Sequence, residues 1–433
     1  MLMKPEELEN AMSLSLKEIL EMAMAKEASD VHLKAGLVPV IRKHGKLRPL
    51  GQGLVQLSSQ DLEKMAVEIL DEEQLNHFQK YKEVDCGYGV QGVGRFRVNI
   101  FKQRGSIRMV IRTITSQVPS IDSLHLPGVL KKIAEYERGL VLVTGITGSG
   151  KSSTLASLIN EINNTKNKHI LTIEDPIEYL IRDKKSIISQ REIGQDTTTF
   201  AAALRSGLRQ DPDVILIGEM RDRDTIETAL TAAETGHLVL STLHTVDAQE
   251  SINRILGVFE HYQHDQIRRQ LAGVLKAVVS QRLCRKKDKT GFVPAVEILI
   301  SNQRVRETIE EAERNVSLRQ IMEESRDTVG MQTFDQSLAD LVEEGLVEMT
   351  EALRMSTNPD DFQLRFSGVA GGGQQWGGRA PASNPGWQSQ ENRFELEIDN
   401  TASHGGDDEE QAAQHEPDPE DRWTQRRTYQ DDD

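Results

Sequence analysis

The chain has 433 residues, more than one ordinary domain requires, and its hydrophobic fraction of 37% is sufficient for buried cores. Its 52 basic and 68 acidic residues give a net charge of −16, and only 4% of its residues are aromatic. This balance disfavours a nucleic-acid-binding protein, which would normally present a basic face and aromatic stacking platforms. The two cysteines, Cys86 and Cys284, exclude a four-cysteine zinc site and favour a reducing compartment.

The N-terminal segment contains no apolar run of signal-peptide length. Nowhere does the chain reach the roughly 20 consecutive apolar residues that a membrane-spanning helix needs. We therefore expect a cytoplasmic protein without direct membrane insertion, which would reach a membrane only through a partner.

Residues 1–116 combine helix-like and strand-like patterns and are expected to form a compact α+β domain. Helices are expected at 13–26 and twice within 59–79, and strands at 29–36, 39–50 and 93–114. Glycine-containing turns at Gly45 and at Arg104-Gly105 divide the two longer strand segments.

Four short apolar runs, each followed by a polar or glycine-marked turn, characterise residues 117–264. They read GLVLVTG, HILTIED, DVILIGE and HLVLSTLH, and helical patterns separate most of them. This alternation predicts a parallel sheet covered by helices, an α/β fold. Residues 265–367 are expected to be a mainly helical C-terminal part.

The composition changes sharply after Phe366. Residues 368–433 contain 5 basic and 15 acidic residues, several glycine-rich stretches and few apolar side chains. Such a segment cannot bury a core, so we expect a disordered acidic tail.

A phosphate-binding loop is predicted at Gly145–Ser152, whose sequence GITGSGKS follows an apolar strand and precedes a helix. In such a loop, backbone N–H groups and the helix N-terminus surround the phosphates. Lys151 would reach the β- and γ-phosphates of ATP, and the Ser152 hydroxyl would bind Mg²⁺. The candidate nucleotide-binding residues of this loop are Gly145, Thr147, Gly148, Ser149, Gly150, Lys151, Ser152 and Ser153.

A second element, DPDVILIGEMRD, is a hydrophobic strand that ends at Gly218-Glu219. A carboxylate at the end of a strand beside the phosphate loop can face Mg²⁺ and the attacking water. Glu219 is therefore the candidate catalytic carboxylate; the alternative is that it only binds a metal-ligated water.

Further candidate residues follow the other strands. Glu174, Asp175 and Glu178 crowd one strand end, where their repulsion favours a nearby cation such as Mg²⁺, unless they form a solvated acidic turn. His244 follows a strand at a position suited to sensing the γ-phosphate, although a lone histidine is more often structural.

Three arginines of the first domain, Arg95, Arg97 and Arg112, lie on the predicted hairpin. They are candidates for the additional cation that assists phosphoryl transfer, in the same subunit or a neighbouring one. Ordinary strand-surface arginines are the alternative.

Four segments together resemble the motifs of the secretion and type IV pilus motor ATPases. The resemblance pairs Walker A with GITGSGKSSTLAS, the Asp box with ILTIEDPIEY, Walker B with DPDVILIGEMRD and the His box with AAETGHLVLSTLHT. The resemblance extends over residues 14–366 and is nearest to the twitching-motility branch, the PilT/PilU family.

This resemblance implies a PAS-like N-terminal domain, a RecA-like ATPase domain and a homo-hexameric ring that hydrolyses ATP with Mg²⁺. It also implies catalytic roles for Glu219, Glu178 and His244 and nucleotide-facing roles for Arg95, Arg97 and Arg112. The crowded carboxylates themselves make Glu174 a candidate metal ligand. The implied partner is the inner-membrane platform protein of the pilus, with a paralogous retraction or extension ATPase as a further candidate and no nucleic acid. The protein would be cytoplasmic and peripheral to the inner membrane.

The leading hypothesis is a motor for pilus retraction. The alternatives are an accessory ring subunit of the PilU kind, an extension or secretion ATPase, and a nucleic-acid motor. The cysteine count disfavours the extension and secretion motors, which usually carry a four-cysteine zinc motif.

Overall fold

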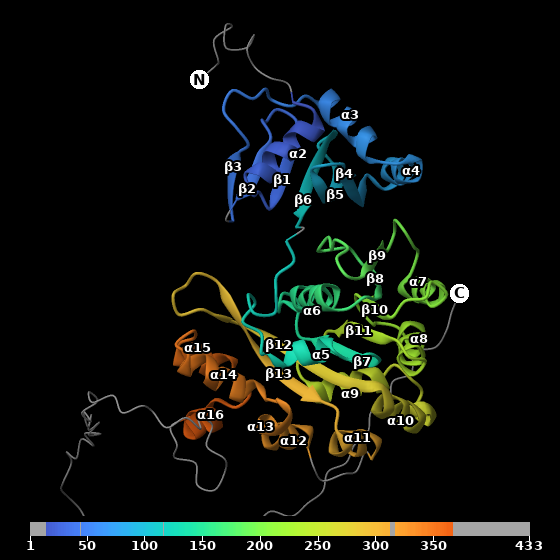
Figure 1. Cartoon of the computed structure of the whole chain (residues 1–433). Helices are drawn as coiled ribbons and strands as arrows, with labels where there is room; N and C mark the ends of the chain where they lie inside the picture. Colours follow the sequence, from blue (N-terminus) through green and yellow to red (C-terminus); the bar gives the residue numbers. More distant parts are fainter. Residues whose placement is uncertain (1–13, 44, 116, 312–316, 367–433) are drawn as a thin grey trace, which may run out of the picture. The chain divides into compact units, whose positions relative to one another are not determined.

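The computed structural model describes residues 14–43, 45–115, 117–311 and 317–366 (Figure 1). The tail expected at 368–433 lies outside these residues. Within them, none of the helices combines the length and the apolar character that crossing a membrane requires.

The N-terminal domain is a six-stranded antiparallel sheet in the order β3-β2-β1-β6-β5-β4. Its strands are β1 (Asp30–Lys34), β2 (Val40–Lys43), β3 (Lys46–Pro49), β4 (Glu83–Val90), β5 (Gly94–Gln103) and β6 (Ser106–Ile114). Its helices are α2 (Leu16–Ala25), α3 (Ser59–Ile69) and α4 (Glu72–Tyr81). The expected helices, strands and hairpin are confirmed, and β4 is an additional strand.

Strand alternation decides which face of this sheet is covered. In β1, Val31 and Leu33 are fully buried in a core shared with residues of α2, α3 and α4, whereas Asp30 and His32 lie on the opposite face. The helices start where the sequence provides caps: Ser15 with Glu18 forms a capping box at α2.

The second domain contains a seven-stranded sheet in the order β13-β12-β7-β11-β10-β8-β9. Its strands are β7 (Gly139–Thr144), β8 (His169–Glu174), β9 (Ile187–Glu192), β10 (Val214–Ile217), β11 (Leu238–Leu243), β12 (Leu275–Arg285) and β13 (Phe292–Ile300). Its helices are α5 (Val129–Ala134), α6 (Lys151–Thr165), α7 (Phe200–Gly207), α8 (Arg223–Glu234), α9 (Ala248–Leu256) and α10 (His264–Val274), with the short 3-10 helix η1 (His261–Gln263).

Neighbouring strands from β12 to β9 pair in parallel, and only the edge pair β12–β13 is antiparallel. Every residue of β7, β10 and β11 is buried, so both faces of the central sheet are covered. The expected parallel α/β sheet is therefore confirmed.

The expectation of a mainly helical segment from residue 265 onward is wrong for residues 275–300, which form the β12–β13 hairpin and extend the main sheet. Ala277, Val278 and Val279 are all fully buried, so the strand lacks the polar–apolar alternation that distinguishes a strand from a helix in sequence.

Short helices complete the C-terminal part, and the last three of them pack with β12 and β13 in a separate small core around Phe334 and Phe362. They are α11 (Gln303–Glu310), α12 (Leu318–Glu324), α13 (Arg326–Val329), α14 (Phe334–Glu343), α15 (Met349–Met355) and α16 (Pro359–Phe366). Arg282 of β12 ties this core to the sheet: its guanidinium carbon lies 3.9 Å from the Phe334 ring centroid, and its Nη1 donates to the Met355 carbonyl at 2.7 Å.

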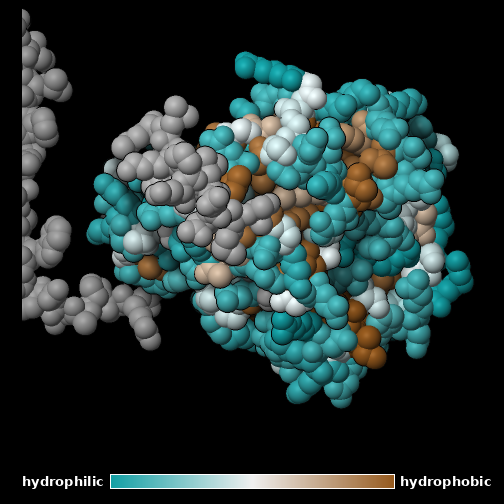
Figure 2. All heavy atoms as spheres, turned by 90° about the horizontal axis from the view of Figure 1, so that it is seen from above, coloured by the Kyte–Doolittle hydropathy of each residue, from teal (hydrophilic) through white to brown (hydrophobic). Residues whose placement is uncertain are grey.

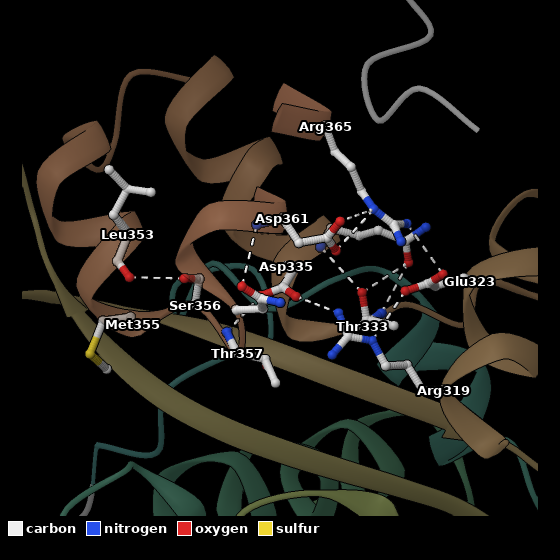
Figure 3. A network of polar contacts seen from close by, with 12 residues as sticks. Arg319, Glu323, Thr333, Asp335, Leu353, Met355, Ser356, Thr357, Asp361 and Arg365 are labelled. Atoms are coloured by element: carbon white, nitrogen blue, oxygen red, sulfur yellow. Dashed lines mark hydrogen bonds and ion pairs between the residues drawn. The ribbon is translucent and has the colours of Figure 1, made fainter. Parts of the chain in front are cut away.

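A polar network joins α12, α14 and α16 (Figure 3). The carboxylate of Asp335 is almost fully buried; it accepts from Arg319 Nη2 at 2.6 Å and from the Thr357 backbone N–H at 2.8 Å. Glu323 accepts from Arg319 at 3.2 Å and pairs with Arg365 of α16 at 3.5 Å. The network therefore fastens the last helix described to the body of the domain.

The surface seen in Figure 2 is hydrophilic over most of the visible face, with hydrophobic side chains in several small groups. Both cysteines are buried and free. Burial raises the pKa of Cys86 to about 12 and that of Cys284 to about 11, so the two thiols are protonated packing residues.

Candidate nucleotide-binding and hydrolytic site

The predicted site elements follow four parallel strands that are neighbours in the sheet: β7, β11, β10 and β8. Because the carboxyl ends of parallel strands meet at one edge of a sheet, the four motifs gather there. They line one cavity of about 390 Å³, within the size range of small-molecule sites.

The phosphate loop connects β7 to α6 in a conformation that requires glycine. Gly145 has φ of 142°, and a Cβ there would lie 2.6 Å from the Gln281 carbonyl oxygen of β12. Gly150, the N-cap of α6, has φ of 92° and provides no side-chain cap, so the first N–H groups of this 15-residue helix remain available for phosphate oxygens. Gln281 also donates from Nε2 to Thr154 Oγ1 of α6 at 2.8 Å.

Lys151 is buried at the start of α6. Its ammonium donates to the carbonyl oxygens of Gly145 and Ile146 at 2.8 and 3.0 Å. Burial lowers its pKa, and the negative charges of Glu219 and Glu178 oppose that effect. The lysine side chain is thus held inside the loop, at the cavity wall.

Most of the predicted loop residues line the cavity: Thr147, Gly148, Gly150, Lys151, Ser152 and Ser153. Gly145 and Ser149 do not; both shape the loop from behind, where Ser149 is buried. Whether these residues bind nucleotide stays a prediction.

Glu219 lies between two basic partners at the end of β10. Its Oε2 is 2.7 Å from Arg221 Nη2 and 3.3 Å from His244 Nε2. Burial alone would raise the pKa of Glu219, but the hydrogen bonds and positive charges of Arg221 and His244 outweigh it, so the pKa is lowered. Glu219 is therefore an ionised carboxylate on the cavity wall.

The other three predicted carboxylates, Glu174, Asp175 and Glu178, line the same cavity. Glu174 Oε1 accepts from Thr172 at 2.7 Å and from Gln190 at 3.2 Å, and burial raises its pKa. Oxygen donors of this kind, together with the Ser152 hydroxyl, fit a hard cation such as Mg²⁺.

Each of the three predicted arginines forms an ion pair with a carboxylate. Arg112 Nε lies 3.1 Å from Asp30, Arg97 Nε lies 3.9 Å from Asp85, and Arg95 Nη2 lies 3.2 Å from Glu192. None of the three arginines is on the wall of the cavity in this single chain. Their nucleotide-facing role stays a prediction.

Sequence reasoning did not single out four further wall residues: Tyr179, Phe200, Arg221 and Thr242. Tyr179 forms a hydrogen bond of 2.8 Å with Ser153, and Thr242 donates to the Gly218 carbonyl at 2.6 Å. Arg221 could have been found, since it lies two residues after Glu219 within the quoted Walker B segment.

Comparison with known proteins agrees with this arrangement. Residues 6–354 match the model of a family described as Type II/IV secretion system protein. Over 349 residues the chain is 43% identical to the "Type IV pilus retractation ATPase PilT" of Pseudomonas aeruginosa, covering 81% of this chain and all of that protein. It is 37% identical over 351 residues to the type IV pilus ATPase PilU of the same organism, covering 81% and 91%.

Among solved structures, the chain is similar to a crystal structure of the pilus retraction motor PilT with bound ADP. The TM-score is 0.73 at 44% identity, and the match covers 81% of this chain and 99% of that one. The similarity therefore includes both the sheet domain and the ATPase domain.

Proposed function

The chain belongs to the Type II/IV secretion system protein family, and from that premise we propose that it is an ATP-hydrolysing motor that drives type IV pilus retraction. The observation that carries the proposal is the meeting of Lys151, Glu219 and His244 on one cavity, each delivered by a motif that follows a parallel strand. The chain is similar to PilT over the whole length of that protein, and this similarity supports pilus retraction as the process that ATP hydrolysis drives.

In the reaction, ATP and water yield ADP and inorganic phosphate. A water oxygen bonds to the γ-phosphorus, the bond from that phosphorus to the β–γ bridging oxygen breaks, and the water releases a proton. Glu219 accepts a hydrogen bond from the attacking water, Lys151 offsets charge on the β- and γ-phosphates, and His244 is proposed to hydrogen-bond the γ-phosphate. Arg95, Arg97 and Arg112 are proposed to contact nucleotide from the first domain.

When bound, Mg²⁺ would offset negative charge on the phosphates. The Ser152 hydroxyl is the proposed protein ligand, with Glu174 as a second candidate. Glu178 lies on the same wall and is proposed to orient water near the phosphates.

We propose that six copies form a ring in the cytoplasm, on the inner face of the membrane, and act on the platform protein at the pilus base. ATP-driven movement of the two domains would turn the platform, so that pilin subunits return to the membrane. The resemblance to the motor ATPases supports this assembly.

A second candidate is an accessory ring subunit that assists a main retraction motor. The 37% identity to PilU over most of the chain supports this accessory role. The higher identity to PilT favours the main retraction motor.

The test is to delete the gene and complement the strain with the wild type or with Lys151→Ala. Excess surface pili without twitching, corrected by the wild type alone, would support a retraction motor powered by this site. Near-normal piliation and motility would indicate the accessory role, and cells without pili would indicate extension.

A further inference from the structure

Arg221 and Glu219 form an ion pair at the cavity. The Arg221 guanidinium approaches the Glu219 carboxylate to 2.7 Å, and both residues line the cavity. The Glu219 side chain is 17% exposed, whereas that of Arg221 is 73% exposed. The pair thus joins an inner carboxylate to a cation that solvent can reach.

The backbone that carries this pair is fixed on both sides. The Gly218 N–H donates to the Ile173 carbonyl of β8 at 2.8 Å, and the Met220 N–H donates to the Thr242 carbonyl of β11 at 3.3 Å. Met220, which lies between Glu219 and Arg221 in the chain, is buried. Directly afterwards, Asp222 caps α8 by accepting from the Thr225 N–H at 2.9 Å.

The charged groups around Glu219 come from several elements. Lys151 from α6 and His244 from the end of β11 are the other basic groups on the wall, and Asp175 and Glu178 are acidic groups that follow β8. Lys151 is already bonded to two carbonyls of the phosphate loop. Among the wall residues that the structure describes, Arg221 is the one arginine, and its charge does not depend on pH in the physiological range.

We propose that Arg221 is a positioning residue for hydrolysis: with His244, its guanidinium holds the Glu219 carboxylate in the orientation that receives the attacking water. This inference rests on the proposed function. A charge-assisted hydrogen bond of this length fixes direction as well as charge. Because Arg221 bonds to Glu219 and not to the phosphate loop, its removal should slow turnover and leave ATP affinity nearly unchanged.

The experiment measures steady-state ATP turnover of the full chain for the wild type, Arg221→Ala, Arg221→Lys and Arg223→Ala. Arg223 is the matched control, because it begins α8, pairs with Glu227 at 3.8 Å and does not line the cavity. For Arg221→Ala, kcat should fall by about 10- to 100-fold, since a misplaced catalytic group costs up to that factor, while KM changes little. Arg221→Lys should retain part of kcat, and Arg223→Ala should retain nearly all.

Rescue by guanidinium ion separates positioning from general stability. Low, non-denaturing guanidinium chloride should restore part of kcat to Arg221→Ala, and equal sodium chloride should not. This inference alone is overturned if the kcat of Arg221→Ala is near that of an active wild type. It is also overturned if kcat falls and neither the lysine variant nor guanidinium restores any of it. A wild type no more active than Lys151→Ala overturns the proposed function and this inference together.

Discussion

In the proposed function Lys151 and Glu219 serve different steps, so single substitutions should separate binding from chemistry. Lys151→Ala removes the ammonium held inside the phosphate loop and should weaken ATP binding. Glu219→Gln keeps the shape of the side chain but removes its charge, so binding should persist while turnover falls by about 10²- to 10⁴-fold. Binding of a fluorescent ATP analogue would measure the first effect, and phosphate release would measure the second. If Glu219→Gln turned over ATP as fast as the wild type, the catalytic assignment of Glu219 would be wrong.

Glu297 of β13 makes stability depend on pH. Its side chain accepts from the Ala248 N–H at 2.9 Å, and burial raises its pKa from 4.5 to about 7. Between these values the folded state binds more protons than the unfolded state, so the free energy of unfolding falls as pH rises, by about 3 kcal/mol in all.

Glu297→Gln keeps the acceptor oxygen and cannot ionise. It should therefore be more stable than the wild type at pH 8 and nearly equal to it at pH 4.5. Urea unfolding at the two pH values would measure this, and an equal difference between the proteins at both would contradict the prediction.

At the scale of elements, the polar network of Figure 3 should contribute to stability through Asp335. Asp335→Ala removes both hydrogen bonds to a buried carboxylate and leaves Arg319 with one partner fewer, at a cost of about 3 kcal/mol. Urea unfolding would measure the loss. Glu324→Ala, which removes an exposed ion pair with Arg304, is the control and should change stability little.

The elements around the site could be predicted because each combines a short apolar strand with a distinctive turn. Glu219 and His244 were placed correctly at strand ends, and the structure brings them within 3.3 Å of each other. That distance depends on the neighbouring positions of β10 and β11 in the sheet, which local sequence patterns do not encode.

Other features depend on contacts that no local pattern reveals. The hairpin β12–β13 was read as helical because its strand residues are buried on both faces. The pairing of Arg112 with Asp30 follows from the register of β1 against β6, residues 82 positions apart in sequence. The sequence alone does not show that Arg112 pairs with Asp30, so it predicts Arg112 as a nucleotide-facing candidate.

For the whole molecule, removal of residues 367–433 should leave ATP turnover and ring assembly intact. The described cores end at Phe366, and the removed part contains few apolar residues and 15 carboxylates. Turnover and sedimentation of the chain ending at Phe366 would measure both properties. Loss of assembly would show that the tail is needed for the ring.

Gln281 and Arg282 are consecutive residues of β12 that contact different parts of the domain. Gln281 contacts α6 and Gly145 of the phosphate loop, and Arg282 contacts Phe334 and α15. An extended strand is nearly inextensible, because its backbone is already close to full length. A shift of β12 at Gln281 would therefore also displace Arg282 and its contacts with Phe334 and α15. One peptide bond thus separates the contacts to the phosphate loop and α6 from the contacts to the C-terminal helices.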